Sequence, residues 1–335
     1  MMFLLLCFVL LVPLSQCSKM NVLFLVVDDM RPELNCYLGP DFPSPVHPNI
    51  HSPHLDALAA KSLLLKRAYV QQAVCSPSRT SLLTGRRPDT THVYDLQTYF
   101  RKSGGNFTTI PQYFKQNGYH SIGMGKIFHP GQASDHDDPI SWSEPYFHPK
   151  NAYNPTGDSW MAVPEHQLVH NRLVDQLLAE HAVSVLDRVA PKAKTGEQPV
   201  FVAVGFHRPH LPFVFPEKFK DYYPEASIRL PDNPYAPWGM PDVAWSSYGE
   251  LRDYTDIAKL HATGNINTTL PAKYVLDLRR AYYSALTYTD SLIGEVLEKL
   301  QEVGMANNTI VSFWGDHGWQ LGKFPSSCLF QSRCG

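Results

Sequence analysis

The sequence has little excess charge of either sign and few long apolar runs. Its 335 residues carry 29 lysines and arginines against 31 aspartates and glutamates, a formal net charge of −2. This balance excludes proteins that rely on a strong positive field to bind nucleic acid or acidic membranes. No apolar stretch is long enough to span a bilayer. Without repeats or low-complexity segments, a composition that is 44% hydrophobic and 18% charged indicates a globular protein with a large core.

Cysteine is scarce as well. Beyond the N-terminal segment only Cys36, Cys75, Cys328 and Cys334 remain. Four cysteines are too few for a disulfide framework in a chain of this length, and none has the spacing to histidine that is typical of a zinc site. Cys75 is unusual because it stands beside a proline and an arginine in CSPSRTSLLTGRR, away from apolar runs and from other cysteines.

The N-terminal segment is a continuous apolar run that ends in a proline and small residues, MMFLLLCFVLLVPLSQCSK. This pattern predicts a secretory signal peptide over residues 1–17, with a buried N-terminal strand or helix as the alternative. Three glycosylation sequons agree with a secretory route and begin at Asn106, Asn267 and Asn307.

Four short apolar runs end abruptly in polar residues: NVLFLVVDD, HSIGMGKIFH, PVFVAVGFHRPH and TIVSFWGDHG. Runs of this kind are typical of strands that are buried on both faces, as in a parallel sheet. Helical patterns lie between them at Pro53–Tyr69, Asp175–Val189 and Arg279–Val303, with Gly304 placed to end the last helix. The sequence therefore predicts an α/β fold with a large, mostly parallel sheet sandwiched by helices.

Ligands of such sheets bind beyond the carboxyl ends of the strands, which is where all four runs place their polar residues. One shared site would collect Asp28, Asp29, Lys126, His129, His207, Asp316 and His317. The alternative for each group is an isolated turn or helix cap. Four such groups together favour the shared site.

Two chemical features distinguish this predicted site. The adjacent carboxylates Asp28 and Asp29 suit a hard divalent cation, and Asp316-His317 would supply the other half of its ligands. Pro77 and Gly85 bound a short helix, so Cys75 would lie just before a helix N-terminus, with Arg79 one turn away. That positive field suits a phosphate or sulfate oxyanion. It also suits a reactive thiolate, so a cysteine hydrolase using His129 or His207 as base is an alternative.

The segment CSPSRTSLLTGR resembles the sulfatase signature Cys-x-Pro-Ser-Arg-x-x-x-Leu-Thr-Gly-Arg without a mismatch. The segments LFLVVDDMRP and GDHGWQLG resemble the family's two metal-binding segments, and GMGKIFHP and GFHRPH resemble its lysine and histidine segments. The resemblance implies an alkaline-phosphatase-like sulfatase fold. It also implies that Cys75 is oxidised to formylglycine by the formylglycine-generating enzyme of the endoplasmic reticulum.

By the same resemblance, one calcium ion would be bound by Asp28, Asp29, formylglycine 75, Asp316 and His317. A hydroxyl of hydrated formylglycine would attack sulfur, and His207 would protonate the leaving sugar oxygen. His129 would then accept the proton of the second hydroxyl, so that sulfate is expelled. Arg79 and Lys126 would neutralise the sulfate.

Within the family, the similarity is greatest to members that remove the 2-O-sulfate of L-iduronate 2-sulfate in heparan and dermatan sulfate. These are lysosomal glycoproteins that act on sulfated glycosaminoglycan oligosaccharides. Arg101, Lys102 and Arg208 are candidates for binding the uronate carboxylate, with solvated surface charges as the alternative. A sulfatase of another sugar or aryl ester, and a truncated isoform without catalytic activity, are the other functions to consider.

The resemblance to the family ends near Gly322. The expected organisation is a signal peptide over residues 1–17, a sulfatase N-terminal catalytic domain over 18–322 and an unrelated tail over 323–335. The smaller C-terminal subdomain of the family is not recognisable, nor is its sulfate-contacting lysine. Because sheet edges and apolar surface would then be exposed, we expect this chain to fold poorly or to be inactive.

Overall fold

The computed structural model describes residues 19–39, 48–155, 157–232, 234–236, 238–241, 247, 249–266, 268–321 and 333–334. The predicted signal peptide, the sequon at Asn267 and most of the predicted tail lie outside these residues. No helix in the described part of the chain is both long enough and apolar enough to cross a membrane.

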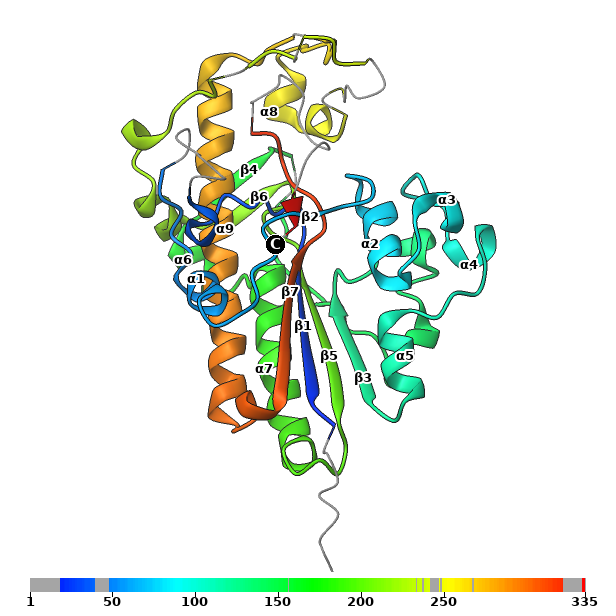
Figure 1. Ribbon diagram of the computed structural model, residues 1–335. Coiled ribbons are helices and arrows are strands. Elements are labelled where there is room, and N and C mark those ends of the chain that lie inside the picture. Colours follow the sequence, from blue (N-terminus) through cyan, green and yellow to red (C-terminus); the bar gives the residue numbers. More distant parts are fainter. Residues whose placement is uncertain are drawn as a thin grey trace, which may run out of the picture.

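A four-stranded parallel sheet forms the centre of the protein (Figure 1). Its strands are β1 (Asn21–Val27), β3 (His120–Gly125), β5 (Val200–Phe206) and β7 (Thr309–Gly315), in the order β3-β5-β1-β7. These are the four strands that the apolar runs predict. All three pairings are parallel, so the carboxyl ends of the strands meet at one edge of the sheet.

Helices cover both faces of this sheet, which confirms the predicted fold class. The long helices α7 (Val174–Ala193) and α9 (Ala272–Glu302) lie on one face, and α2 (Cys75–Thr84) and α5 (Ile110–Gln116) lie on the other (Figure 1). Alternate side chains of β1 enter two separate apolar cores. Leu23, Leu25 and Val27 pack in the core that contains α7 and α9, whereas Val22, Phe24 and Val26 pack in the core beneath α2 and α5.

The remaining elements are short. The other helices are α1 (Pro53–Ala59), α3 (Pro88–Thr91), α4 (Phe100–Ser103), α6 (Glu165–Leu168) and α8 (Thr255–Ala258). The 3-10 helices are η1 (Asn35–Tyr37), η2 (Gly131–Ser134), η3 (Pro139–Ser141), η4 (Glu217–Tyr222), η5 (Glu225–Ser227), η7 (Glu250–Asp253) and η8 (Ala306–Asn308). Strands β4 (Trp160–Val163) and β6 (Phe213–Pro216) form a parallel pair, and β2 (Ala68–Tyr69) pairs antiparallel with β8 (Arg333–Cys334).

The helix predictions differ from the structure in their lengths. Both long helices begin before the predicted residue, and α7 also ends later, whereas α9 ends at Glu302, one residue before the predicted Val303. Gly304 follows at φ 75°, as the predicted end of this helix requires. The predicted helix Pro53–Tyr69 is wrong in its second half, because α1 ends at Ala59. Beyond Ala59, Leu64 packs against the core, whereas Leu63 and Leu65 are 86% and 52% exposed.

The two edges of the sheet are covered to different extents. Beside β3, the backbone N–H groups of Ser143 and Phe147 donate to Ser121 O and Gly123 O at 2.7 and 3.2 Å. In the part of the chain that the structure describes, β7 pairs only with β1, and Ile310 on β7 is 54% exposed. The expectation that the chain folds poorly or is inactive assumes exposed sheet edges of this kind. That expectation remains a prediction.

Candidate active site and metal centre

The parallel register brings two predicted acidic groups side by side. Val27 of β1 pairs with Gly315 of β7, so Asp28-Asp29 and Asp316-His317 leave neighbouring strands at the same level. The Asp29 N–H donates to Asp316 Oδ1 at 3.0 Å. A Cβ on Gly318 would lie 2.9 Å from the Arg31 backbone nitrogen, so the second segment can cross the first this closely only with glycine there.

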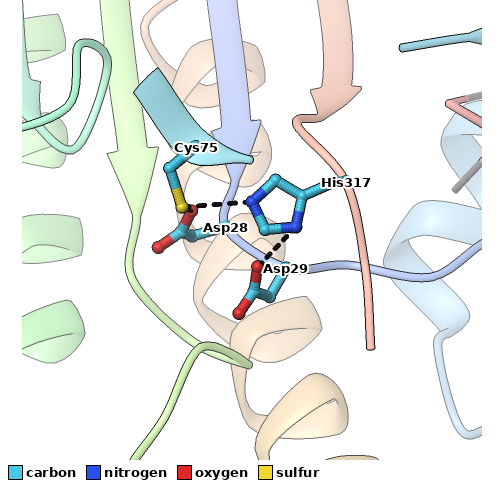
Figure 2. A group of neighbouring side chains, drawn as sticks. All are labelled: Asp28, Asp29, Cys75 and His317. Carbon is cyan, nitrogen blue, oxygen red and sulfur yellow. Dashed lines mark hydrogen bonds and ion pairs between the residues drawn. The ribbon is translucent and has the colours of Figure 1, made fainter. Parts of the chain in front are cut away.

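Four side chains converge at this point, as Figure 2 shows: Asp28, Asp29, Cys75 and His317. One ligand atom from each lies within 4.8 Å of all the others, and all four residues are buried. Cys75 Sγ is 3.1 Å from His317 Nε2, and His317 Nδ1 is 2.8 Å from Asp29 Oδ1. We call these four residues the Cys75 cluster.

Helix α2 places Cys75 in this cluster. It begins at Cys75 itself, with Val74 as its extended N-cap, so the expectation that Cys75 lies just before the helix is wrong by one position. Gly85 closes the helix at φ 63°, as predicted. The Ser78 hydroxyl donates to Asp316 O at 2.6 Å and so connects the first turn of α2 to the segment that follows β7. The positive end of the helix dipole therefore faces the Cys75 cluster.

Arg79 forms hydrogen bonds with residues that follow three different strands of the sheet. It is 0% exposed, and its Nε and Nη2 donate to Asp316 Oδ2 and Asp28 Oδ1 at 2.8 and 2.9 Å. Its Nη1 donates to the carbonyl oxygens of Lys126 and Ile127. Arg79 is thus a scaffold for the cluster as well as a positive charge within it.

Lys126, the residue directly after β3, is the second permanent positive charge at the site. Its Nζ donates to Asp28 Oδ2 and lies 3.6 Å from Cys75 Sγ. Burial alone would raise the pKa of Asp28, but the charges of Lys126, His210 and Arg79 hold that pKa well below its usual range. Asp28 is therefore an ionised carboxylate that can bind a cation.

The two predicted proton-transfer histidines have different environments. His207 follows β5, and its Nδ1 is 3.3 Å from Asp175 Oδ1, which also accepts the His207 N–H at 2.7 Å. Asp175 therefore fixes the orientation of the ring. Burial, with the charges of Lys126 and Arg79, lowers the pKa of His129 to about 4, so this ring is neutral at higher pH.

A third histidine belongs to the site and was not assigned to it from the sequence. His210 Nε2 lies 3.9 Å from Asp28 Oδ2 and 3.8 Å from both Asp29 Oδ2 and Glu250 Oε2. Burial opposes its charge, but the Asp29 and Asp28 carboxylates raise the pKa of His210 to about 10. The available signal was its position in GFHRPH, three residues after His207.

The candidate uronate-binding residues lie outside the Cys75 cluster. Arg208 is buried, and its backbone N–H donates to Asp175 Oδ2 at 2.9 Å, so it supports the histidine segment. Arg101 forms a partly buried pair with Asp138, with Nε 2.6 Å from Oδ1, and Lys102 is exposed. Both described sequon asparagines, Asn106 and Asn307, are exposed, which glycosylation requires.

The cluster has features that a bound cation would explain. Asp29 Oδ1 and His317 Nδ1 are buried and 2.8 Å apart, yet their geometry makes no hydrogen bond, so each lacks a directed partner in the described structure. With a thiol at position 75 the donors are nitrogen, oxygen and sulfur, which suit zinc. An oxygen in place of that sulfur would leave mainly oxygen donors, which suit calcium. The residues therefore fit a divalent cation, with calcium requiring the modified side chain.

The remaining predicted ligand, Asp316, is placed differently. Its Oδ1 accepts the N–H groups of Asp29 and His317 at 3.0 and 2.9 Å, and its Oδ2 accepts from Arg79. Oδ2 lies 3.6 Å from His317 Nε2, so Asp316 adjoins the Cys75 cluster. Both of its carboxylate oxygens thus already accept hydrogen bonds from the protein.

Comparison with known proteins identifies relatives. A family model described as Sulfatase matches residues 20–331. The chain is 40% identical over 328 residues to iduronate 2-sulfatase of Homo sapiens, covering 92% of this chain and 56% of that protein. It is 31% identical over 346 residues to a sulfatase of Formosa agariphila, covering 95% of this chain and 63% of the relative. The chain thus spans a little over half the length of the curated relatives it matches.

Solved structures give the same fold. The phosphonate monoester hydrolase of Agrobacterium radiobacter has a TM-score of 0.64 at 19% identity, covering 94% of this chain and 66% of that one. A protein solved with its substrate D-glucosamine-2-N,6-O-disulfate also has a TM-score of 0.64, at 16% identity, covering 94% of this chain and 69% of that one. At these identities the likeness shows the fold alone.

Proposed function

The chain belongs to the sulfatase family, and from that premise we propose that it hydrolyses the 2-O-sulfate ester of L-iduronate 2-sulfate units in heparan and dermatan sulfate. The observation that carries the proposal is the convergence of Asp28, Asp29, Cys75 and His317 beside Arg79 and Lys126. The choice of sugar is supported by the 40% identity to iduronate 2-sulfatase. Lysosomal action after entry into the secretory pathway is part of the proposal.

The charges at the site favour this chemistry once a divalent cation is bound. Three buried carboxylates, Asp28, Asp29 and Asp316, face two permanent cations, Arg79 and Lys126. The charged ring of His210, 3.8 Å from Asp29 and 3.9 Å from Asp28, adds a third cation, so these six groups about cancel without a metal. A divalent cation would make the site positive, so the site would attract the sulfate monoanion.

Formylglycine at position 75 would supply a hydrated aldehyde as the nucleophile, and calcium would supply positive charge beside it. Lys126 Nζ, which lies 3.6 Å from the Cys75 sulfur, would neutralise the sulfate at the point of attack. Arg79 would hold the carboxylates in place. The first turn of α2 would direct its N–H groups toward the sulfate oxygens.

The two histidines divide the proton transfers in this proposal. His207 would donate a proton to the leaving sugar oxygen, with its ring held by Asp175, whose Oδ1 lies 3.3 Å from Nδ1. His129 would accept a proton, because its pKa of about 4 keeps the ring neutral above that pH.

A second candidate is an isoform that binds ligand but has no turnover. The observation that favours it is the exposed edge of β7, where Ile310 is 54% exposed in the described structure. A sulfatase of another sugar or an aryl ester is the alternative within the family. A substrate panel separates these readings.

The decisive test combines the mass of one peptide with turnover. Full-length chain secreted by animal cells would be digested with trypsin, and the peptide between Arg67 and Arg79 would be weighed. We expect the mass of an aldehyde in place of the thiol and hydrolysis of a 2-sulfated iduronide, with Cys75→Ser as the inactive control. An unmodified thiol would contradict the sulfatase mechanism. An aldehyde without turnover of the iduronide, a 6-sulfated glucosaminide or an aryl sulfate would favour the isoform without activity.

A further inference from the structure

An unusual backbone turn follows the segment that carries His129. Asp135, His136, Asp137 and Asp138 have φ values of 51°, 60°, 71° and 50°, so four consecutive non-glycine residues adopt the left-handed conformation. Each such residue costs roughly 1–2 kcal/mol. Strain of this kind persists where surrounding contacts enforce it, and it is common at functional sites.

The Asp138 carboxylate enforces the turn. Asp138 is 0% exposed, and Arg101 donates to both of its oxygens, from Nε at 2.6 Å and from Nη2 at 2.8 Å. The hydroxyls of Tyr99 and Ser141 donate to the same carboxylate. Four hydrogen bonds from side chains therefore hold the Asp138 carboxylate at the end of the turn. The bidentate guanidinium contact also fixes the orientation of the carboxylate.

Arg101 is in turn fixed to a separate part of the chain. Its Nη2 donates to Gln112 Oε1 at 2.9 Å, and its Nη1 donates to Phe107 O at 3.0 Å. Gln112 belongs to the capping box of α5, where its N–H donates to Thr109 Oγ1 at 3.2 Å. The turn is thus attached to a helix that packs against the sheet, and its position does not depend on solvent-exposed contacts.

Short backbone contacts connect the turn to His129. The His136 N–H donates to Gly131 O at 2.9 Å, and the Asp138 N–H donates to Ser134 O at 2.7 Å. Gly131 lies two residues after His129. Within the described structure, His129 Nδ1 is buried without a hydrogen-bond partner. Because no side chain fixes this nitrogen, the direction of the ring depends on the backbone that carries it.

We propose that the Asp138–Arg101 pair is a positioning device that sets the orientation of His129 through the left-handed turn. The proposal rests on the proposed function for the role of His129 as a proton acceptor. It assigns Arg101, a candidate for uronate binding, to alignment of the site and not to substrate contact. A base displaced by about 1 Å can cost about 100-fold in rate.

The first experiment measures the position of His129 without using turnover. In the full-length chain, Arg101→Lys and Asp138→Asn would be compared with wild type and with Arg188→Lys, whose guanidinium pairs with Glu144 nearby on the surface. Hydrogen exchange would report on residues 130–142, and carbethoxylation by diethyl pyrocarbonate would report on His129, with His207 as internal reference. We expect faster exchange and at least a several-fold change in His129 reactivity in the two variants, but not in the control.

The second experiment uses kinetics on aldehyde-containing enzyme. We expect kcat for a 2-sulfated iduronide to fall about 100-fold in Arg101→Lys, with KM within about threefold of wild type. A rise in KM at constant kcat would instead support uronate binding and overturn the proposal. Faster exchange with unchanged His129 reactivity and kcat would reduce the pair to a structural role and also overturn it.

Two further arms keep the test decisive. If the variants do not fold, Tyr99→Phe removes one hydrogen bond to Asp138 and should give a smaller change of the same kind in His129 reactivity. Unchanged reactivity in Tyr99→Phe would then contradict the proposal. If the wild-type chain has no turnover at all, the proposed function fails, and the labelling experiment alone still decides whether the pair positions His129.

Discussion

Two arginines, Arg79 and Arg101, both bind buried aspartates, but the hydrogen bonding of the carboxylates beside them differs. Beside Arg79, Asp29 Oδ1 and His317 Nδ1 have no directed hydrogen bond in the described structure. Beside Arg101, both oxygens of Asp138 accept hydrogen bonds, from Arg101, Tyr99 and Ser141. The first group is arranged for a ligand, whereas the second holds the backbone.

The energetic cost of burial explains why this difference is informative. A buried polar atom without a partner costs about 1–3 kcal/mol, and a charged one costs more. A fold tolerates that cost where a bound group restores the missing contacts. At the Cys75 cluster, Asp29 Oδ1 and His317 Nδ1 contact each other at 2.8 Å without an aligned hydrogen bond, and four ligand-type side chains converge, which together favour a cation site. The carboxylate of Asp138, with both oxygens hydrogen-bonded, indicates a structural contact.

The largest effect should come from Arg79→Gln. The change leaves Asp28 and Asp316 buried without their shared guanidinium, and breaking a buried pair in this way typically costs about 3–5 kcal/mol. We expect a loss of this size in the free energy of unfolding, measured with urea in the presence of a chelator. Arg101→Gln, which removes the partner of a single aspartate, is the matched control and should cost less. An equal or smaller loss at Arg79 would contradict the comparison.

Asp29→Asn should weaken calcium binding. The asparagine can still accept from Trp319 Nε1, which donates to Asp29 Oδ2 at 3.1 Å, and it tolerates the left-handed φ of 57°. The metal-free chain should still lose stability, because the buried rings of His317 and His210 lose a carboxylate partner. The calcium concentration that gives half of the thermal shift should rise at least ~10-fold, because a charged ligand is lost.

The control for this prediction is Asp138→Asn. It should lower stability without changing calcium affinity, since Asp138 holds the turn through Arg101 and lies outside the Cys75 cluster. If both variants weakened calcium binding equally, the distinction between a ligand-binding and a structural aspartate would be lost.

The fold and the location of the site could be predicted because they depend on local patterns. Continuous apolar runs identify all four strands of the sheet, and parallel strands must end at the same edge. That rule brings Asp28 next to Asp316 without any knowledge of the loops. The predicted helix Pro53–Tyr69 was too long because the conformation of the chain beyond Ala59 depends on which leucines find a tertiary contact, and this cannot be read from spacing.

Contacts between distant segments were harder to predict. His210 enters the site only because the Arg208-Pro209 segment turns back over Asp28 and Asp29. Asp175, 32 residues before His207, orients that ring from the start of α7. The pairing of Arg101 with Asp138 joins residues 37 positions apart through an irregular turn. None of these contacts has a periodic signal, since each depends on loop geometry.

Another buried aspartate, Asp290, makes a prediction about pH possible. Its oxygens accept the N–H groups of Leu55 and His54 at 2.8 and 3.2 Å and so cap α1, yet burial outweighs these bonds and raises the pKa of Asp290 to about 6. An ordinary aspartate has a pKa near ~3.9 in the unfolded chain. The folded state therefore binds more protons between these values, and this contribution to stability is lost as pH rises through about 6.

Asp290→Asn removes this titration. The free energy of unfolding of wild type minus that of the variant should decrease between about pH 4 and pH 7, by on the order of 2–3 kcal/mol. Urea unfolding at both pH values measures it, and the difference cancels the carboxylates that both proteins share. A difference that stays constant with pH would show that two backbone N–H donors are enough to keep this buried carboxylate at its ordinary pKa.

The smallest effect should come from Arg188→Ala, which tests how much of the strength of the Arg79 and Arg101 contacts is due to burial alone. Arg188 donates to both oxygens of Glu144 at 3.0 and 2.6 Å, the same bidentate chemistry as Arg101 with Asp138, but its side chain is 52% exposed. Exposed pairs of this kind contribute about 0–1 kcal/mol and weaken in salt. We expect a loss of less than ~1 kcal/mol in the free energy of unfolding at low salt. A loss of about 2 kcal/mol or more would mean that geometry, and not burial, gives the Arg101 and Arg79 contacts their strength.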